Sequence, residues 1–502
     1  MVHRRPHSPS SLEATCSSQQ AGQKTEPESL IKAFDELLEE ASAACKQSRS
    51  RERLRSHLLA QLACFGEHTV SGILCALGQQ FQDWTAAYRF YSHQRVDPQP
   101  LFCAVRRQIE SSLPPSSPLV VALDDSLLRK RGRKIPGATW RVDPLGPAFQ
   151  VNFVWAQRVV QLAAALPYGS EGAARTVPID FAHAPSAPRP RKGAPPQAWD
   201  AYREEQKRLN LNSQAAKRLH QLTRQLVLEG QTHPLWVTVD GGYTNKTFLK
   251  QAPAEAIIIG RVRKDSRLHE PVNRPPGPAG GRPRRYGTLL PTPEALRKDE
   301  HVPWQEVVAF AAGKRHMFKV KTLGPVLWRV TGTQRLLRLI VLAPLAYRPR
   351  KGSHLLYRKP AYLICTDPNL SLEEILQAYL WRWGIEVNFR DEKTLLGVGQ
   401  ARVRNPHASH AVPAVVVAAY ALLLAAADRA RLLPQLPLPA WQQVSSPSKP
   451  STGRLINQLR YELWTDALRP GLRDFMSPTQ LYQNSHKPAP HLESSVLYAS
   501  AG

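Results

Sequence analysis

The first regular pattern of apolar positions along the chain is helical. Ile31, Phe34 and Leu37 recur three residues apart, which places them on one face of a helix. Short helical segments of this kind continue through the next eighty or so residues, so we expect a helical domain over residues 27–112. Residues 1–26 lack the pattern, and their high content of Ser, Gln, Pro and Thr predicts a disordered lead.

Continuous apolar runs replace helical spacing after a proline-rich linker. The runs LVVAL at 119–123, LWVTV at 235–239 and AIIIG at 256–260 are short and rich in β-branched residues, which predicts buried strands. The third run is apolar on both faces, as is typical of a central parallel strand. The pattern alone supports an α/β domain, whose first part we assign to residues 115–264.

Two segments between these strands carry weaker signals. The sequence FQVNFVWAQRVVQLAAALP, residues 149–167, predicts a hairpin that turns near Gln157 and Arg158. Residues 171–212 are rich in Pro and Arg and predict a loop, followed by a helix over residues 202–209.

The second half of the chain begins with short β-like runs over residues 265–357, which predict a β-rich insertion. The core resumes over residues 358–432 and includes an apolar segment at 411–427. That segment is shorter than the roughly 20 residues that cross a bilayer, so we expect a buried core helix and no membrane partner. Residues 433–502 are predicted to form a C-terminal tail with a helix near 455–463.

Residues 371–393, SLEEILQAYLWRWGIEVNFRDEK, contain no proline and predict one uninterrupted helix that begins with a capping box. Four polar residues fall within about 60° of one another around its axis, namely Tyr379, Arg382, Glu386 and Lys393. A solvated face laced with ion pairs gives the same pattern. The apolar residues elsewhere on this helix leave little of it free for water, so we favour a functional site.

The composition of the chain favours a polyanionic partner. Lys and Arg number 67 against 40 acidic residues, a formal net charge of +27. Nucleic acid is the partner that such an excess indicates first, although an arginine-rich soluble protein gives it too. The six cysteines form no CxxC pair, which suits a reducing compartment and argues against structural zinc. The N-terminus has no secretory pattern, so we expect a cytoplasmic protein.

The pattern Tyr-x2-Arg-x3-Glu-x6-Lys at residues 379–393 resembles the signature of bacterial insertion-sequence transposases of the DDE type. The resemblance includes the core Arg-Trp-x-Ile-Glu and the ending Phe-Arg-Asp-x-Lys. It implies a ribonuclease-H-like mixed-sheet catalytic core interrupted by a β-rich insertion, in the α/β class. It also implies that Glu386 is the third of three carboxylates, and that two aspartates upstream follow strands.

The chain supplies those aspartates, because Asp124 and Asp240 each follow an apolar run. Three carboxylates suit two Mg²⁺ or Mn²⁺ ions per active site, held about 3.5–4 Å apart. Asp124 and Asp125 point to opposite faces of a continuing strand. The family places its aspartate two residues before a Thr or Ser, which favours Asp124, with Ser126 in the hydroxyl position, over Asp125.

The resemblance assigns DNA contacts to Tyr379, Arg382 and Lys393, where cations offset developing phosphate charge. It implies double-stranded DNA partners, namely transposon ends and target, and a homodimer on DNA. The helical domain over residues 27–112 would suit recognition of a DNA end. A tryptophan in the insertion stacks on a flipped base in part of this group. Trp304 and Trp328 lie in that region, but a place in the core suits each of them better.

Other functions compete with transposition. A tyrosine recombinase needs an Arg/His/Arg cluster around a C-terminal tyrosine, and Tyr498 stands alone, so we reject that class. A metal-dependent DNA nuclease would use the same carboxylates. A catalytically silent DNA-binding descendant would keep the fold, but all three carboxylates are present. The sequence therefore predicts a DNA transposase that cuts and joins element ends in a bacterial cytoplasm.

Overall fold

The computed structural model describes residues 29–147, 149–169, 172–272, 284–332, 334–348, 352–431 and 449–473, and side chains up to residue 464. The predicted disordered lead over residues 1–26, most of the predicted tail and Tyr498 lie outside them.

The helices that the structure describes are α1 Leu30–Glu40, α2 Ser48–Ala63, α3 Val70–Ala76, α4 Thr85–Ser92, α5 Gln99–Ser112, α6 Pro196–Arg208, α7 Leu211–Leu228, α8 Lys246–Gln251, α9 Pro293–Lys298, α10 Leu372–Trp381, α11 Trp383–Thr394, α12 Pro406–Arg429 and α13 Thr452–Arg473. The strands are β1 Leu119–Arg129, β2 Thr139–Val142, β3 Phe153–Tyr168, β4 Ala173–His183, β5 Leu235–Val239, β6 Ile257–Arg261, β7 Gln305–Ala311, β8 Lys314–Val326, β9 Leu337–Leu342, β10 Ala346–Tyr347, β11 Leu356–Tyr357 and β12 Ala361–Cys365.

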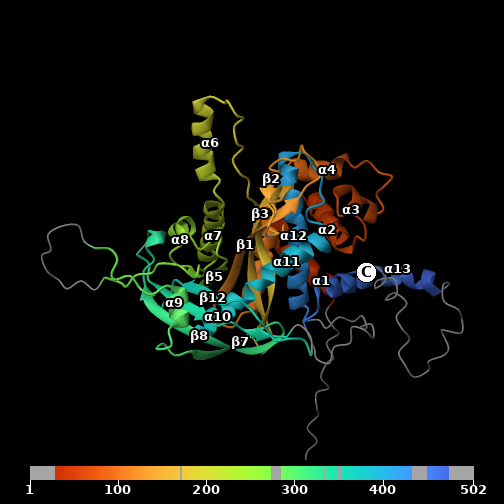
Figure 1. Cartoon of the computed structure of the whole chain (residues 1–502). Helices are drawn as coiled ribbons and strands as arrows, with labels where there is room; N and C mark the ends of the chain where they lie inside the picture. Colours follow the sequence, from red (N-terminus) through yellow and green to blue (C-terminus); the bar gives the residue numbers. More distant parts are fainter. Residues whose placement is uncertain are drawn as a thin grey trace, which may run out of the picture.

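One mixed sheet of ten strands organises the described part of the chain, in the order β2-β3-β1-β5-β6-β12-β9-β8-β7, with β4 paired to β3 (Figure 1). β1, β5 and β6 are parallel to one another, while β3 and β12 run antiparallel to their neighbours. The apolar runs that predicted buried strands are β1, β5 and β6. The sheet and its covering helices confirm the α/β class with a ribonuclease-H-like mixed sheet.

The strands predicted for the insertion continue this sheet. β9 pairs with β12, β8 pairs with β9, and β7 forms the far edge. β10 and β11 form a separate two-stranded sheet. The β-rich segment is therefore hydrogen-bonded to the strands of the core in one sheet. The exact domain bounds stay a prediction.

The predicted hairpin turn near Gln157 and Arg158 is wrong, because β3 runs straight through both residues. The polar side chains have partners that let them stay within the strand. Gln157 Nε2 donates to the Pro136 carbonyl at 2.7 Å, and Arg158 lies 3.3 Å from Asp125. β3 pairs with β2 and β4 along one edge and with β1 along the other.

The predicted loop over residues 171–212 also needs correction, because it contains β4. Pro178 hid this strand in the sequence, since a proline has no N–H for the ladder. The structure accommodates Pro178 at an irregularity in the β3–β4 pairing, where prolines are tolerated in strands. The predicted helix at 202–209 belongs to α6, which begins earlier, at Pro196, and has no buried residue.

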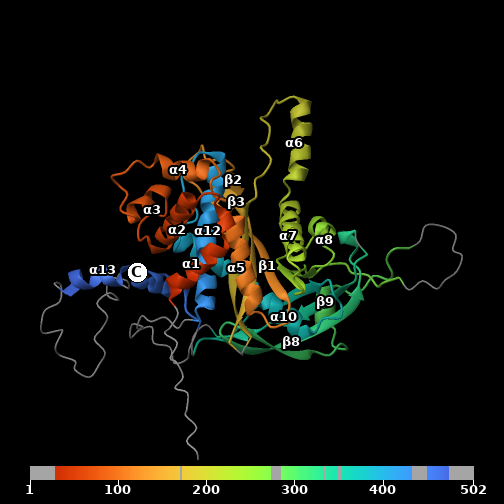
Figure 2. The same cartoon turned by 180° about the vertical axis from the view of Figure 1, so that it is seen from behind.

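The apolar helix α12 is the axis around which the N-terminal helices pack. It is long and apolar enough to cross a membrane, yet 83% of its most apolar window is buried inside the protein. α1, α2, α4 and α5 contact it, as does β4, and both views show it between α2 and the sheet (Figures 1 and 2). Segment 27–112 thus shares a core with the carboxyl-terminal part of the chain.

The predicted single helix over residues 371–393 is divided at Arg382 into α10 and α11. The capping box of Ser371 and Glu374 is confirmed at its start. At the division, the Ile385 amide donates to the Arg382 carbonyl instead of reaching back four residues. The Trp381 carbonyl accepts from the Thr176 hydroxyl of β4 at 3.3 Å. A strand that the sequence pattern concealed therefore holds the joint of the signature helix.

Candidate active site

The three predicted carboxylates line one cleft of ≈ 930 Å³. Asp124 comes from β1, Asp240 from the residue after β5, and Glu386 from the first turn of α11. Because β1 and β5 are parallel neighbours with Leu123 opposite Val239, the two aspartates leave the sheet at the same level. The fold thus brings together residues that lie far apart in the sequence.

Asp124 and Asp125 have different surroundings, although both line the cleft. β1 continues through them, so their side chains alternate between the faces of the sheet. Asp124 faces Arg382 of the joint between α10 and α11, at 3.2 Å. Asp125 accepts a hydrogen bond from the Tyr243 hydroxyl at 2.9 Å and lies 3.3 Å from Arg158. Asp124 is therefore the aspartate that shares a partner with Glu386.

Arg382 bridges two carboxylates. Its Nη2 donates to Glu386 Oε1 at 2.8 Å, and its Nη1 donates to Asp124 Oδ2 at 3.2 Å. The Arg382 side chain is 13% exposed, so these charge-assisted bonds lie largely out of water. Sequence reasoning placed Arg382 against DNA phosphate, whereas here its guanidinium faces its own chain.

Burial dominates the protonation of Asp124. Removal of its carboxyl from water raises the pKa to about 7, an effect that Arg382 opposes and that the nearby Asp240 reinforces. Near neutral pH this carboxyl is poised between its two forms, so a further cation nearby would favour the charged form.

Asp240 is fixed by the turn that follows β5. Its Oδ1 accepts from the Gly242 amide at 2.8 Å and from the Tyr243 amide at 3.3 Å, an Asx-type turn. Tyr243 also binds Asp125, so one turn positions both Asp240 and the phenol behind β1.

Lys393 lies at the far end of α11 and lines the cleft. Its Nζ donates to the Ser126 hydroxyl at 2.6 Å, and burial lowers its pKa. Tyr379 lies behind Arg382, whose guanidinium carbon is 5.9 Å from the centre of the phenol ring. Burial raises the pKa of Tyr379. Glu386 and Lys393 therefore face the cleft, while Tyr379 and Arg382 support it from behind.

The donor set suits a hard divalent cation, because all three groups are carboxylates. Among the described side chains, however, no group of three or more His, Cys, Asp or Glu is placed so that it could hold a metal ion. Arg382 instead provides the positive charge between Asp124 and Glu386. The carboxylates therefore suit a cation by their chemistry, and Arg382 occupies the position between two of them.

Sequence reasoning missed most of the basic lining of the cleft. Exposed cations from β1 and α11 and from the segments that follow them surround the carboxylates, namely Arg129, Arg131, Arg390 and Arg402. The basic run RKRGRK after β1 was the available signal. One residue of this run, Lys130, has a structural role. It is buried and donates to the carbonyls of Gly399 and Ala401. Burial lowers its pKa to about 8.

The two tryptophans of the insertion lie within the fold. Trp328 is 8% exposed and belongs to the main core, and Trp304 packs against the edge of that core. The Lys321 ammonium lies 4.6 Å from the Trp304 ring centre. Neither tryptophan lines the cleft.

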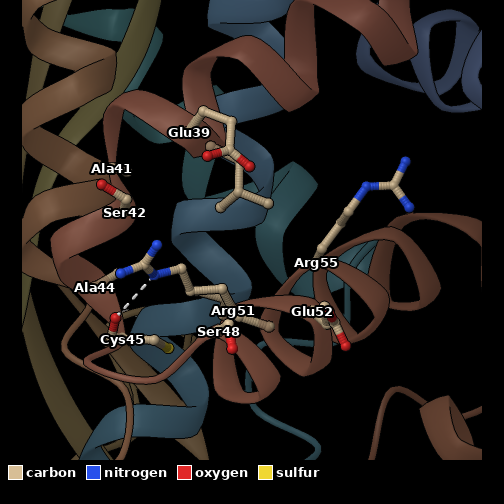
Figure 3. Close-up of a pocket in the computed structure, with 11 residues that line it drawn as sticks. Glu39, Ala41, Ser42, Ala44, Cys45, Ser48, Arg51, Glu52 and Arg55 are labelled. Atoms are coloured by element: carbon tan, nitrogen blue, oxygen red, sulfur yellow. Dashed lines mark hydrogen bonds between the residues drawn. The ribbon is translucent and has the colours of Figure 1, made fainter.

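A second, smaller hollow of ≈ 220 Å³ lies between α1 and α2, remote in sequence from the carboxylates (Figure 3). Arg51 projects along its wall and donates to the Cys45 carbonyl at 3.2 Å. Arg55 on its rim pairs with Asp35 at 2.6 Å. These two cations have partners within the chain, and the hollow contains none of the three predicted carboxylates.

Comparison with known protein families identifies the chain. A family model described as DDE superfamily endonuclease matches residues 42–335, more than half of the chain. The chain belongs to this family. The matched region contains Asp124 and Asp240 and ends before the helix that carries Glu386. Among curated proteins, none matches the chain.

Family membership has direct consequences for function. A DDE superfamily endonuclease acts on DNA as a nuclease or transposase, and nucleases of this superfamily generally use divalent metal ions. In this DDE endonuclease, the cleft holds acidic groups that suit such ions, and basic groups that suit a DNA backbone surround them.

Proposed function

We propose that this DDE endonuclease is a bacterial insertion-sequence transposase, which binds the ends of its element and catalyses DNA cleavage and strand transfer. The observation that carries the proposal is the meeting of Asp124, Asp240 and Glu386 in one cleft. The family model supports DDE-type chemistry, and the signature over residues 379–393 supports the insertion-sequence type.

In this proposal, Asp124, Asp240 and Glu386 hold two Mg²⁺ or Mn²⁺ ions. Bound ions of this kind activate the attacking oxygen and stabilise the leaving oxygen of a phosphodiester. Asp240 is already oriented by its turn, whereas Asp124 and Glu386 are held by Arg382. Arg382, beside Tyr379, would be available to a DNA phosphate if bound cations neutralised Asp124 and Glu386 in its place.

Lys393 has a separate role, because its ammonium donates to the Ser126 hydroxyl at the edge of the cleft. From that place at the rim it can bind the DNA strand near the scissile phosphate. The exposed arginines around the cleft extend the cationic surface on which the duplex lies. With six to ten phosphate contacts, affinity for duplex DNA falls by about 10³–10⁵ between about 50 and 200 mM salt.

Two further features belong to the proposal. Transposition joins two ends, so we expect a homodimer on DNA, with each copy contributing one cleft. The N-terminal helices over residues 27–112 carry the preference for the element ends, and the protein works in the bacterial cytoplasm. A metal-dependent nuclease without strand transfer is the second candidate, since the family description specifies an endonuclease and both reactions use one site.

The test uses the full chain and DNA that carries the sequences flanking its own gene. Wild-type protein with Mg²⁺ should cut at the element boundary and join the resulting 3′-hydroxyl end to a plasmid. Ca²⁺, which prefers a larger and looser coordination shell, should permit binding without cutting. Asp240→Asn should bind this DNA but neither cut nor join it, whereas Asp200→Asn, on exposed α6, should behave as wild type.

The products separate the candidates. Cutting without joined products, even from pre-cut ends, supports the nuclease. Cutting that Asp240→Asn retains, or cutting that persists in a chelator, contradicts both candidates. A covalent protein–DNA adduct contradicts the direct attack by water or hydroxyl that the carboxylates imply.

A further inference from the structure

The hairpin formed by β2 and β3, with the described residues between them, exposes several large apolar side chains. Phe149 is 90% exposed, and Leu145 is 86% exposed. With their exposed neighbours they form what we call the hairpin patch, namely Trp140, Val142, Leu145, Phe149, Val151 and Phe153. Soluble proteins seldom leave large apolar groups clustered in water, so the hairpin patch indicates a binding surface.

The hairpin patch lies in a basic stretch of the chain, of which Lys130 and Arg141 are buried. Residues 126–158 contain seven Lys or Arg and a single acidic residue, Asp143. Asp143 is already paired with Arg129, at 2.8 Å. Arg131, Arg133 and Lys134 are exposed and form no ion pair with an acidic group among the described residues.

One cation of this stretch lies against two aromatic rings of the hairpin. The Arg133 guanidinium carbon lies 4.7 Å from the ring centre of Trp140 and 5.3 Å from that of Trp155. The two indoles meet edge to face, with centres 5.7 Å apart. Trp140 is 54% exposed, so part of its ring stays open to a planar group that stacks on it.

The hairpin patch is continuous with the cleft. Val142 and Leu145 belong to the patch and also line the cleft that holds the carboxylates. β2 lies at the edge of the sheet, next to β3 and one strand away from β1 (Figure 1). A strand of DNA whose phosphate reaches Asp124 is therefore close enough for its neighbouring nucleotides to meet the hairpin.

We propose that the hairpin patch binds unpaired bases of the DNA strand that occupies the cleft. Aromatic faces next to cations are the surface that single-stranded nucleic acid needs, because bases stack while phosphates pair with Lys and Arg. Paired bases hide their faces in the duplex, so the patch distinguishes opened DNA from intact duplex. This inference rests on the proposed function, since it takes the DNA substrate from it.

Charge decides against a second copy of the chain as the occupant. Two hairpins facing each other would bring the same cationic surfaces together, with Asp143 as the single acidic residue on each side, and such like-charge contacts are unfavourable. An anionic lipid surface would satisfy both charge and apolar area, and it enters the test as a competing outcome.

The experiment compares the full chain with Phe149→Ser/Phe153→Ser, and with Phe81→Ser as the matched control. Phe81 is 93% exposed and lies between α3 and α4, outside the hairpin. Binding is measured without divalent ions for an oligo(dT) strand and for a duplex of equal length. The double variant should bind the single strand about tenfold or more weakly, with duplex affinity changed less than about twofold.

A second probe reports stacking directly. A duplex with an internal unpaired stretch carries 2-aminopurine, whose fluorescence falls when it stacks. Wild type and Phe81→Ser should quench it, and the double variant should not. Phe149→Ser alone should show part of the loss, which keeps the test valid if the double variant folds poorly.

Several outcomes would overturn the inference. Equal weakening for single strand and duplex would remove the stacking role. Unchanged single-strand binding, together with lost sedimentation on phosphatidylserine vesicles or with a lost dimer in size-exclusion chromatography, would assign the patch to a lipid surface or a second copy. The proposed function is tested separately, because Asp240→Asn should lose cleavage and keep the preference for unpaired DNA.

Discussion

Arg382 donates to Glu386 at 2.8 Å, across one turn of the same helical segment, while its other terminal nitrogen reaches Asp124 on the sheet. A single guanidinium thus holds the helix carboxylate and the strand carboxylate at once. Two like charges repel each other unless a cation lies between them. Arg382 meets that need within the chain, and a metal ion would compete with it for the same two groups.

Arg382→Gln should therefore make the protein more dependent on divalent ions. Removing the cation leaves Asp124 without its opposing charge, which should lower the free energy of unfolding by about 1–3 kcal/mol in chelator. Added Mg²⁺ no longer competes with a guanidinium for these carboxylates. Mg²⁺ should therefore raise the Tm of the variant by more than it raises the Tm of wild type. Differential scanning fluorimetry with and without Mg²⁺ measures both effects.

Arg390→Gln is the control for this prediction. Arg390 also lines the cleft and lies on α11, but it pairs with Asp391 and its side chain is 67% exposed. Its replacement should leave the Mg²⁺-induced rise in Tm at the wild-type value. If Arg382→Gln shows that same rise, Arg382 does not compete with the ion.

Substitution by asparagine should affect DNA cleavage differently at the two neighbouring aspartates. Asp124→Asn removes charge from the group that faces Arg382 and Glu386, so DNA cleavage should fall by orders of magnitude. Asp125→Asn keeps the Tyr243 hydrogen bond and loses only the ion pair with Arg158, so most cleavage should remain. The two variants are compared by their cleavage rates at saturating DNA. The reverse ranking would make Asp125 the first carboxylate.

The fold and the site were predictable from the sequence to different degrees. The two-residue period of a strand separated Asp124 from Asp125, and the capping box located the start of α10. The division at Arg382 was not predictable, because it depends on Thr176 in a strand that Pro178 concealed. Arg382's bond to Asp124 joins residues 258 positions apart, which no local pattern reports.

Gly384→Ala tests the contact that holds the joint. A Cβ on Gly384 would overlap the Thr176 side chain, so α11 must shift away from β4. Overpacking of this kind costs about 1–3 kcal/mol, and the displaced Glu386 should lower cleavage as well. Thermal unfolding and cleavage assays measure the two losses. Thr176→Gly should relieve the overlap in the double variant. Gly66→Ala, with open space around it, should change neither thermal stability nor cleavage.

Glu386→Gln separates catalysis from DNA binding. The substitution keeps the shape of the side chain and removes the charge that would hold an ion, so cleavage should fall by several orders of magnitude. Loss of a negative charge in a cationic cleft should leave DNA affinity level or slightly higher. Lys393→Ala should instead weaken DNA binding with the carboxylates intact. A Glu386→Gln protein that cuts and joins at the wild-type rate would end the assignment.

Glu392, on the buried side of α11, should make stability fall as pH rises. Its side chain is 1% exposed, and burial raises its pKa to about 8 from the ordinary 4.5. Between these values the folded chain holds a proton that the unfolded chain has released. This contribution is therefore complete below pH 4.5 and is lost as pH rises through about 8, at about 1.4 kcal/mol per pH unit.

Glu392→Gln removes this titration and keeps the side chain's size. Its free energy of unfolding should decline less between about pH 6 and about pH 8 than that of wild type, so the variant gains relative stability at the higher pH. Urea unfolding at the two pH values measures the difference. Glu373→Gln, exposed in the first turn of α10, should keep the wild-type slope. If Glu392→Gln also keeps the wild-type slope of stability against pH, the Glu392 carboxyl is ionised in the folded protein throughout this range. Water or a cation must then reach it.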